Sequence, residues 1–276
     1  MPFGRPPAGA GARRWRLPQA AAAGSSHDGG AGDSVVSMFG SEERRVALVT
    51  GASAGIGAAT VRKLATSGHA VAFCARDPEK VERLAQEVGA GGANGSGAEV
   101  LGLAADMSDA TSIDAFLERA TAELGPADVL VNNVGQSPSR NFLRMSDDDW
   151  RALFDLNLIA AVRCTRAVLP AMRERKWGRI VMVGSAAAKL PNAPLVDYAA
   201  SKAALLATAK ALAGRYGRDG VLVNSVLPGL IHTPMWERAA GEIAAATDST
   251  PEAVIEKLGA DVPVGRYGTP EEVAEV

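Results

Sequence analysis

What the sequence has little of already removes several classes of protein. Its 276 residues include only two cysteines, Cys74 and Cys164, and three histidines, His27, His69 and His232. Two cysteines in apolar surroundings favour buried thiols over a disulfide, and these few ligand types form no cluster with zinc spacing. We therefore expect no metal site, and we interpret the three histidines as surface or loop residues without a catalytic role.

Charge and long apolar runs are limited as well. The formal net charge is −2, which offers no basic surface for nucleic acid. No stretch of about 18 apolar residues occurs, so the sequence predicts no membrane span. Hydrophobic residues make up 47% of the chain and charged residues 22%, as is ordinary for a globular protein. The length suffices for one large domain with a real hydrophobic core.

The first forty residues differ from the rest in composition. Residues 1–40 are rich in glycine, alanine and proline without periodicity, which predicts a disordered N-terminal extension. Its arginines and lack of acids up to residue 27 suit an organelle transit peptide, and a mis-assigned start with Met38 as the true first residue is another alternative. The run Ala20–Ala23 is too short for a secretory signal. We expect a cytoplasmic protein, with organelle targeting as the alternative.

Residues 41–276 alternate between short apolar runs and helical patterns. This alternation predicts a single doubly wound α/β domain of the Rossmann type, with a parallel sheet and helices on both faces. Strands are predicted over residues 46–50, 70–75, 100–104, 128–132, 179–183 and 221–226. Helices are predicted from residue 56 and over residues 78–88, 108–124, 147–172 and 196–216, with Ser108 and Ser146 as N-caps.

A glycine-rich loop, Thr50-Gly-Ala-Ser-Ala-Gly-Ile-Gly57, joins the first strand to a helix. Glycine allows a tight turn and a close approach to pyrophosphate, and a helix N-terminus offers free amides. A tight turn of any α/β protein is the alternative, but the strand–loop–helix context favours a nucleotide. Arg76 ends the second strand and favours NADP over NAD, because arginine can meet a 2′-phosphate. Asp77 comes next and is the alternative, because an acidic residue at this place would favour NAD. It is better suited to capping the following helix.

Three polar side chains follow with the spacing of an acid–base site. Tyr198 and Lys202 lie one helical turn apart, and Ser185 lies thirteen residues upstream at the end of a strand. A neighbouring ammonium and a positively charged nicotinamide would lower the pKa of the phenol from its usual value of about 10. The Ser185 hydroxyl suits donation to a carbonyl oxygen. The alternatives are an amphipathic helix with an exposed lysine and a turn serine; no histidine–acid pair supports a hydrolase triad.

In order and spacing these motifs resemble the short-chain dehydrogenase/reductase family, in its Tyr-x-x-x-Lys branch and near the 3-oxoacyl reductase-like ketoreductases. The resemblance runs from about Arg44 to the end. It rests on the glycine loop, Asn132-Asn133-Val134-Gly135, Asn157, Ser185, Tyr198, Lys202 and Pro228-Gly229. It implies that Tyr198 is the general acid of reduction, that Lys202 binds the nicotinamide ribose and lowers the Tyr198 pKa, and that Ser185 holds the carbonyl oxygen. Asn157 would kink its helix and hold a water that links Lys202 to solvent.

The resemblance also implies a set of residues for NADP. They are Gly51, Ser53, Gly55, Ile56, Gly57, Arg76, Asp106, Met107, Asn133, Gly135, Tyr198, Lys202, Pro228, Gly229, Ile231 and Thr233. Within this set Asp106 would contact the adenine, and Asn133 would contact the adenosine half while bracing the central strands. Ile231 and Thr233 would touch the nicotinamide carboxamide.

The expected substrate is a small-molecule carbonyl compound or secondary alcohol. Residues 230–264 should form a lid over an apolar pocket, to which Leu190, Leu195, Val196, Met235 and Trp236 contribute. The alternative function is nucleotide binding without turnover, and a sugar epimerase is disfavoured because no room remains for a substrate domain. We expect a homotetramer or homodimer, with neither nucleic acid nor membrane as a partner.

The C-terminal end departs from the family pattern. The sequence stops at Val276, inside a helix that begins near Pro270, whereas family members continue into a last strand. That strand is expected to be missing here, which would leave a sheet edge uncovered. A truncated gene sequence is the favoured explanation.

Overall fold

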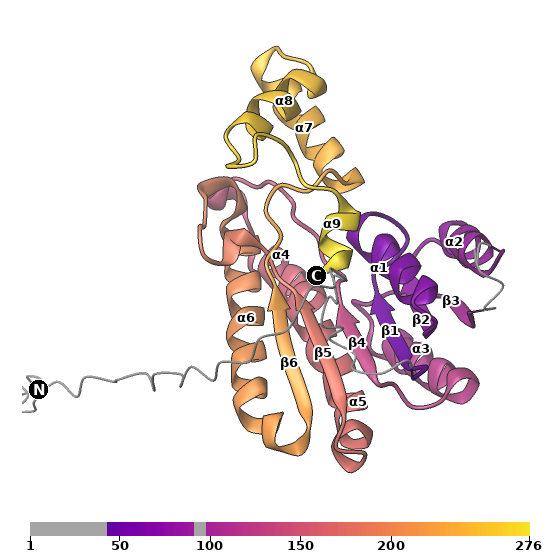
Figure 1. Cartoon of the computed structure of the whole chain (residues 1–276). Helices are drawn as coiled ribbons and strands as arrows, with labels where there is room; N and C mark the ends of the chain where they lie inside the picture. Colours follow the sequence, from indigo (N-terminus) through magenta and orange to yellow (C-terminus); the bar gives the residue numbers. More distant parts are fainter. Residues whose placement is uncertain (1–42, 91–97) are drawn as a thin grey trace, which may run out of the picture. The chain divides into compact units, whose positions relative to one another are not determined.

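A computed structural model describes residues 43–90 and 98–276, so the predicted extension over residues 1–40 lies outside the described residues. Six parallel strands form one sheet in the order β3-β2-β1-β4-β5-β6 (Figure 1). They are β1 (Val46–Thr50), β2 (Ala70–Ala75), β3 (Val100–Ala104), β4 (Val129–Asn132), β5 (Gly178–Val183) and β6 (Val221–Val226). The strand order reverses between β1 and β4, and such sheets bind ligands at this point, outside the carboxyl ends of the strands.

Helices cover both faces of the sheet, as the sequence predicts. One face carries α1 (Gly55–Thr66), α2 (Pro78–Ala90) and the short α9 (Pro270–Glu275), which packs against α1. The other face carries α3 (Ala110–Leu124), α5 (Ala160–Glu174) and α6 (Val196–Tyr216), with α4 (Asp147–Phe154) packed against α6. The predicted bounds of β1, β2, β3, β6 and α6 agree with the structure.

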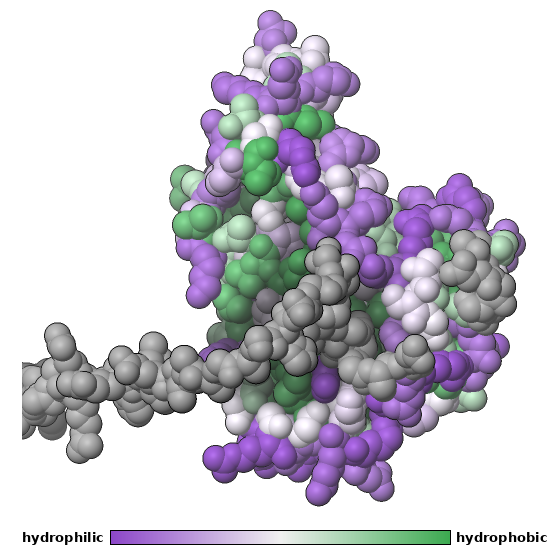
Figure 2. Space-filling model, in the orientation of Figure 1, coloured by the Kyte–Doolittle hydropathy of each residue, from purple (hydrophilic) through white to green (hydrophobic). Residues whose placement is uncertain are grey.

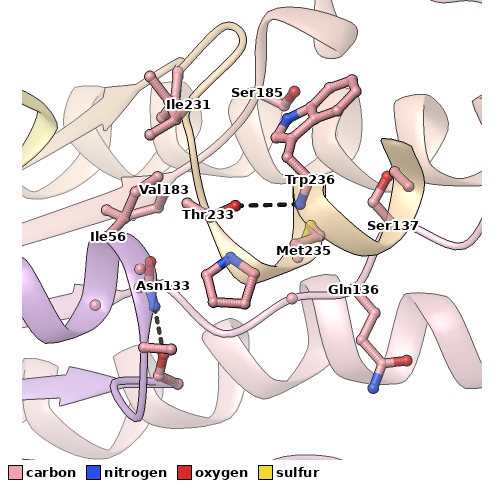
Figure 3. Close-up of a pocket in the computed structure, with 18 of the residues that line it drawn as sticks. Ile56, Asn133, Gln136, Ser137, Val183, Ser185, Ile231, Thr233, Met235 and Trp236 are labelled. Carbon is pink, nitrogen blue, oxygen red and sulfur yellow. Dashed lines mark hydrogen bonds between the residues drawn. The ribbon is translucent and has the colours of Figure 1, made fainter. Parts of the chain in front are cut away.

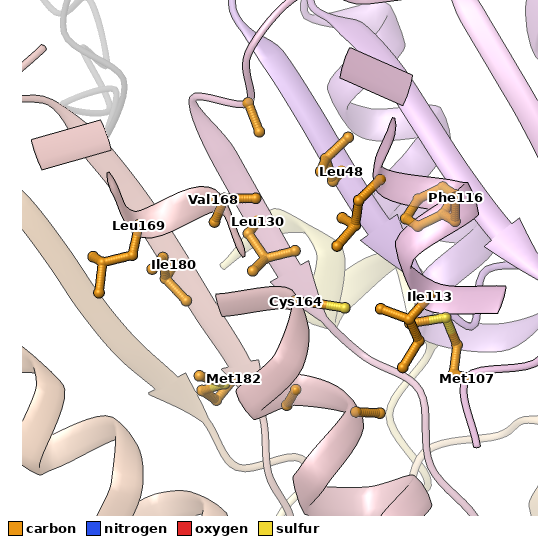
Figure 4. Packing of buried hydrophobic residues seen from close by; sticks show 14 of the residues in the cluster. Leu48, Met107, Ile113, Phe116, Leu130, Cys164, Val168, Leu169, Ile180 and Met182 are labelled. Carbon is orange, nitrogen blue, oxygen red and sulfur yellow. The ribbon is translucent and has the colours of Figure 1, made fainter. Parts of the chain in front are cut away.

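The main core lies between the sheet and the helices α3 and α5 (Figure 4). Every residue of β1 and β2 is buried, because a parallel sheet covered by helices hides both faces of its central strands. Leu130 and Ile180 from the strands meet Ile113 of α3 and Cys164 of α5. Burial raises the pKa of the Cys164 thiol, and likewise that of Cys74, to about 12. The prediction of two buried thiols is confirmed.

The single helix that the sequence predicts over residues 147–172 is in fact three segments. The helix α4 ends at Phe154, a π-helical segment η2 spans Asp155–Ile159, and α5 follows from Ala160. Hydrophobic periodicity cannot reveal this interruption, because a one-turn π segment keeps the chain helical while rotating the following face. The predicted cap of α4 is correct: the Ser146 side chain accepts from the Asp149 amide in a capping box.

The predicted cap of α3 is wrong. Asp109, not Ser108, caps α3: its carboxylate accepts from the Thr111 and Ser112 amides. Ser108 lies one residue before this N-cap, and its hydroxyl donates to Asp106. His69 lies in the loop between α1 and β2, in agreement with the sequence analysis, and it is buried, with 6% of its surface exposed.

The helices α7 (Pro234–Thr247) and α8 (Pro251–Ala260) form a layer of their own, drawn at the top of Figure 1. A small separate cluster holds this α7–α8 layer together, and its buried members are Ala240, Ala244 and Val254. A β-bridge between Ile231 and Gly268 joins the chain on either side of the layer. Figure 2 shows hydrophobic surface beneath this layer, framed by more hydrophilic surface above and below.

Candidate active site

The glycine-rich loop between β1 and α1 has a conformation that requires glycine. Gly51 and Gly55 have φ angles of 69° and 56°, in the left-handed region that other residues rarely adopt. A Cβ at Gly51 would lie 2.7 Å from the Val134 Cα, closer than real contacts allow. The loop is therefore seated directly against the chain that leaves β4.

Hydrogen bonds of Asn133 and Thr50 hold the glycine-rich loop against the chain that leaves β4. The Asn133 side-chain amide donates to the carbonyl oxygens of Thr50 at 2.9 Å and Gly51 at 2.8 Å. The Thr50 hydroxyl in turn accepts from the amides of Asn133 and Val134. A Cβ at Gly57 would lie 2.6 Å from both the Asn133 amide nitrogen and the Gly51 oxygen, so the first turn of α1 has no spare room. Asn133 braces the central strands as the sequence predicts.

The N-terminus of α1 differs from those of most other described helices. Ala54 occupies its N-cap and makes no side-chain cap hydrogen bond. By contrast, Thr233 caps α7, Thr250 caps α8 and Thr269 caps α9. The first amides of α1 therefore need another acceptor, and the positive end of the helix dipole faces the cavity beside them. This cradle of glycines and free amides fits a dinucleotide pyrophosphate.

A cavity of about 1550 Å³ runs along the carboxyl ends of the strands. It brings together nearly all of the residues that the sequence predicts for the site. Those that line it are Gly51, Ser53, Gly55, Ile56, Gly57, Arg76, Met107, Asn133, Gly135, Ser185, Tyr198, Lys202, Pro228, Gly229, Ile231 and Thr233. Figure 3 shows Met235 and Trp236, from the start of α7, in the same cavity as Ser185 and Ser137. Of the predicted apolar lining, only Val196 is not among the residues that form the wall.

One end of the cavity is cationic. Arg76 lines it together with Lys80 and Arg83 from α2. Asp77 stands beside them, but its carboxylate accepts from the Glu79 and Lys80 amides and lies 3.4 Å from the Lys80 ammonium. Asp77 thus caps α2, as the sequence predicts, and its charge is already compensated. This arrangement favours a ligand that carries a negative charge near Arg76.

Asp106 lies close to this end but outside the cavity wall. Its carboxylate accepts from the Ser108 amide at 2.9 Å and from the Ser108 hydroxyl at 2.7 Å, and these bonds lower the pKa of Asp106. The carboxylate therefore has partners of its own within the turn. An adenine contact from Asp106 remains a prediction.

Tyr198, Lys202 and Ser185 meet where α6 passes the end of β5. The Lys202 ammonium donates to the Val183 carbonyl at 2.8 Å and lies 5.9 Å from the centre of the Tyr198 ring. Lys202 has 3% of its surface exposed, and burial lowers its pKa to about 8. Ser185 lies beside Tyr198 at the N-cap of the short η3 (Ala186–Ala188) turn, where its hydroxyl accepts from the Ala187 amide.

The surroundings of Tyr198 in the protein raise its pKa, while the predicted fall depends also on a positively charged nicotinamide beside the phenol and stays a prediction. Burial raises it, and a hydrogen bond with the Ser185 side chain lowers it by less. The physical reason is that the phenol loses water on burial, while the Lys202 ammonium directs its hydrogen bond to the strand carbonyl. Lys202 is thus placed beside the phenol without being hydrogen-bonded to it.

Asn157 lies outside the cavity wall and acts on the residues around it. It sits in the π segment η2, is 1% exposed, and exchanges two hydrogen bonds of 2.9 Å with the backbone of Gln136. Its amide also donates to the Ser201 hydroxyl on α6. A Cβ at Gly135 would lie 3.2 Å from the Lys202 ammonium nitrogen and 3.3 Å from the Asn157 amide oxygen. Glycine there leaves these two side chains within reach of one another.

Sequence reasoning missed two residues that support this arrangement. Thr50 was recognised only as the end of a strand, yet its hydroxyl accepts two amides beyond β4. Ser201 is fully buried, and its hydroxyl joins Asn157 to the Tyr198 carbonyl, to which it donates at 2.7 Å. The position of Ser201 one turn after Tyr198 was a usable signal. The sequence placed Thr50 at the start of the glycine-rich loop but could not reveal its hydrogen bonds, because they cross between strands far apart in the chain.

Among residues 43–90 and 98–276 no group of three or more histidine, cysteine, aspartate or glutamate side chains is placed to hold a metal ion. Over the same residues no helix has the length and apolar character needed to cross a membrane.

The fold and the site together define the class of protein. The chain belongs to the short-chain dehydrogenase family, whose sequence model matches residues 45–243. A Streptomyces virginiae protein named as a ketoacyl reductase of the monensin polyketide synthase is 42% identical over 232 residues, which are 83% of this chain and 87% of that protein. The 3-oxoacyl-(acyl-carrier-protein) reductase FabG of Pseudomonas aeruginosa is 38% identical over 232 residues, 84% of this chain and 87% of its own length.

Solved structures agree with this assignment. An actinorhodin polyketide ketoreductase with NADPH superimposes with a TM-score of 0.78 at 34% identity, over 85% of this chain and 89% of its own. The L-sorbose reductase of Gluconobacter frateurii, complexed with NADPH and L-sorbose, gives a TM-score of 0.78 at 31% identity, over 84% and 87% of the two chains. The expected Rossmann-type fold and family membership are confirmed.

Proposed function

We propose that this protein is an NADP(H)-dependent ketoreductase that interconverts a carbonyl compound and a secondary alcohol, with Tyr198 as the general acid of reduction and the general base of oxidation. The observation that carries the proposal is that Tyr198, Lys202 and Ser185 share one cavity with an uncapped glycine-loop helix. One end of this cavity is built to hold phosphates, and the other presents a phenol to a small polar group.

NADP(H) suits the phosphate end of the cavity. The amides of α1 and the turn at Gly51 would hold the pyrophosphate, and Arg76 would meet the 2′-phosphate. Bound there, the cofactor supplies or accepts the hydride. Gly135 leaves Lys202 open to the cavity, where its ammonium would hold the nicotinamide ribose. The names of the NADPH-bound relatives support the choice of NADP over NAD.

The residues of this chain provide the proton chemistry. Ser185 would donate to the carbonyl oxygen of the substrate and hold it beside the Tyr198 hydroxyl. Burial favours the neutral phenol, so Tyr198 is protonated and ready to act as an acid during reduction. Lys202 would supply the positive charge that stabilises the phenolate left behind. Asn157, held by Gln136 and Ser201, would keep this end of α6 in place and carry a water toward Lys202.

A 3-oxoacyl thioester is the substrate class that the comparisons favour, since the relatives are named for ketoacyl reduction. The substrate end of the cavity suits it, because Leu190, Leu195, Met235 and Trp236 form a largely apolar wall around the polar Ser185 and Tyr198. The alternative of nucleotide binding without turnover is not favoured, because Ser185, Tyr198 and Lys202 all line the same cavity.

The test begins with the purified protein. NADPH and NADH are titrated against it, with nicotinamide fluorescence as the signal, and NADPH oxidation is then followed with a short 3-oxoacyl thioester and with a panel of simple ketones. We expect tighter binding of NADPH than of NADH, and turnover of the thioester. Binding of NADPH without turnover of any carbonyl compound would overturn the reductase assignment. Equal affinity for the two cofactors would overturn the role of Arg76.

A further inference from the structure

A buried carboxylate stands directly before the proposed catalytic tyrosine and is absent from the roles assigned so far. Asp197 has no exposed surface. Its Oδ1 accepts from the Tyr198 amide at 2.8 Å, and its Oδ2 lies 3.3 Å from the Arg140 guanidinium, which donates to it. A carboxylate removed from water in this way requires compensation by a cation and hydrogen-bond donors. Arg140 is therefore the partner on which the burial of Asp197 depends.

The helix α6 begins without a capping side chain, which gives the carboxylate a second task. Leu195 occupies the N-cap and makes no side-chain cap hydrogen bond. Asp197 is the acidic residue of the first turn, where a negative charge is favourable and where the helix amides lack partners. By accepting from the Tyr198 amide, the carboxylate fixes the backbone from which the phenol projects.

Arg140 connects this carboxylate to the part of the cavity wall that follows β4. It ends a segment after β4 whose residues Gln136, Ser137 and Ser139 line the cavity. The Arg140 amide donates to the Pro194 carbonyl at 3.1 Å, and its guanidinium also donates to the Asp149 carbonyl on α4 at 3.4 Å. The segment is thus held at one end by Asn157 through Gln136, and at the other end by Arg140.

Asp149 is not an equivalent partner for Arg140. Its Oδ1 is 3.6 Å from the guanidinium, but its Oδ2 accepts from the Ser146 amide and hydroxyl in the capping box of α4. It is also partly exposed, whereas Asp197 has no surface in contact with water. The contact to Asp197 is the one that reaches the catalytic helix.

We infer that Arg140 and Asp197 form a positioning pair, which holds the start of α6, and with it Tyr198, against the cavity wall formed by residues 136–139. The inference rests on the proposed role of Tyr198. Neither residue touches the reacting atoms; the pair sets the distance between the phenol and a substrate carbonyl held by Ser185. Catalysis is sensitive to such placement, because a displacement of about 1 Å can cost about 100-fold in rate.

The test compares Arg140→Ala, Asp197→Asn and the double variant in single-turnover reduction with saturating NADPH. We expect Arg140→Ala to lower the rate about 30-fold, because it strands a buried charge beside Tyr198, and Asp197→Asn about 10-fold. The double variant should lose no more than about 10-fold in rate relative to the unmodified protein. It should therefore be faster than Arg140→Ala, because it no longer contains an unpaired buried carboxylate. The NADPH dissociation constant and the substrate KM should stay within about two-fold in all three.

The matched control is Asp219→Asn, which breaks the 2.7 Å ion pair between Arg173 and Asp219. It should leave the single-turnover rate unchanged. Arg140→Lys keeps the charge at a partly exposed position and covers the case in which Asp197→Asn does not fold; its rate should lie between those of the unmodified protein and Arg140→Ala. A rate within two-fold of the unmodified protein in folded Arg140→Ala would overturn the inference, as would losses that simply multiply in the double variant.

A second readout separates this inference from the proposed function. Amide hydrogen exchange at the start of α6 should speed up in Arg140→Ala and Asp197→Asn but not in Asp219→Asn. This measurement needs no turnover. An unmodified protein that does not reduce carbonyl compounds would overturn the proposed function alone, while unchanged exchange in the pair variants would overturn the positioning pair alone.

Discussion

The two ends of the cavity are built in different ways. At the cofactor end, comprising the glycine loop and the carboxyl ends of β1, β2 and β4, position is set by backbone and by fully buried residues such as Thr50. At the substrate end, the α7–α8 layer rests on a cluster of three buried residues. A Cβ at Gly57 would meet backbone atoms at 2.6 Å and 2.8 Å, whereas the α7–α8 layer lines the cavity with side chains such as Trp236.

The difference shows which half of the site is fixed by the fold. The cofactor end cannot change without disturbing the central strands, because its hydrogen bonds run between β1 and β4. The chain on either side of the α7–α8 layer is joined by a β-bridge, and Trp236 of α7 makes an edge-to-face contact with Tyr267, 5.6 Å between ring centres. Substrate choice can therefore vary in this family while the cofactor site stays the same.

The largest expected effect is on the pH dependence of stability, and it arises from the buried ammonium of Lys202, which lies where the two ends of the cavity meet. Burial lowers the pKa of Lys202 from its ordinary 10.5 to about 8, so between these values the unfolded chain binds more protons than the folded one. Stability from this group therefore rises with pH across that window, and its cost is fully present below about pH 8. The free energy of unfolding of the unmodified protein should therefore rise relative to that of Lys202→Met, by up to ~3 kcal/mol between pH 8 and pH 10.

Urea unfolding at a series of pH values measures this trend. Lys210→Met, at an exposed position on the same helix, is the control and should show no comparable trend. A pH-independent difference between Lys202→Met and the unmodified protein would mean that burial does not weaken the proton affinity of Lys202.

Gly57→Ala tests whether the cofactor end is as rigid as the geometry indicates. The added methyl group meets the Gly51 oxygen at 2.6 Å and the Ala52 Cα at 2.8 Å, and neither backbone atom can move freely. We expect NADPH affinity to fall about 100-fold, or ~2.7 kcal/mol. Gly214→Ala is the control, because a Cβ there meets open space in a helix and should be neutral or slightly stabilising. Unchanged NADPH binding in Gly57→Ala would remove the contrast between the two ends.

Arg76→Ala tests whether Arg76 discriminates NADPH from NADH. Loss of the guanidinium should weaken NADPH binding about 10- to 100-fold and leave NADH binding nearly unchanged, because only NADPH carries the 2′-phosphate. Fluorescence titration of the same variant with both cofactors supplies its own control. An equal loss of affinity for NADPH and NADH would show that Arg76 stabilises the structure of the cofactor end and does not bind the 2′-phosphate.

Trp236→Ala should have the smallest effect, and it should be confined to the substrate end. We expect KM for the carbonyl substrate to rise about 5- to 10-fold, while the NADPH dissociation constant stays the same. The lost ring contact with Tyr267 should also cost ~1 kcal/mol of stability. Trp236→Phe keeps an aromatic ring, so its KM and its stability should both lie close to those of the unmodified protein. A change in NADPH affinity in Trp236→Ala would show that the two ends are not independent.

Local sequence patterns predicted much of the fold and the site because both depend on short-range features. Apolar runs predicted the strands, since a parallel sheet buries both faces of each strand. The glycine loop and Tyr198-x-x-x-Lys202 were predicted because strand-end loops and one helical turn place these residues in a common cavity. The bounds of α6 are those of the predicted helix.

Features that depend on contacts between distant parts of the chain were not predictable in this way. The π segment around Asn157 leaves the helical pattern unbroken in the sequence, and only the family resemblance predicted an irregular helix at that residue. The burial that raises the pKa of Tyr198 follows from packing across the whole domain, which the local sequence does not reveal. The pairing of Arg140 with Asp197 joins residues that are 57 positions apart.

The most direct test of the central claim compares Tyr198→Phe with Tyr216→Phe, two substitutions of one hydroxyl at the two ends of the same helix. Tyr216 packs with Arg173 and Arg215, away from the cavity wall. NADPH binding and carbonyl reduction are measured for both. We predict that Tyr198→Phe binds NADPH as tightly as the unmodified protein but reduces substrate about 1000-fold more slowly, while Tyr216→Phe is unaffected in both. Turnover by Tyr198→Phe within ten-fold of the unmodified protein would contradict a role for Tyr198 as general acid.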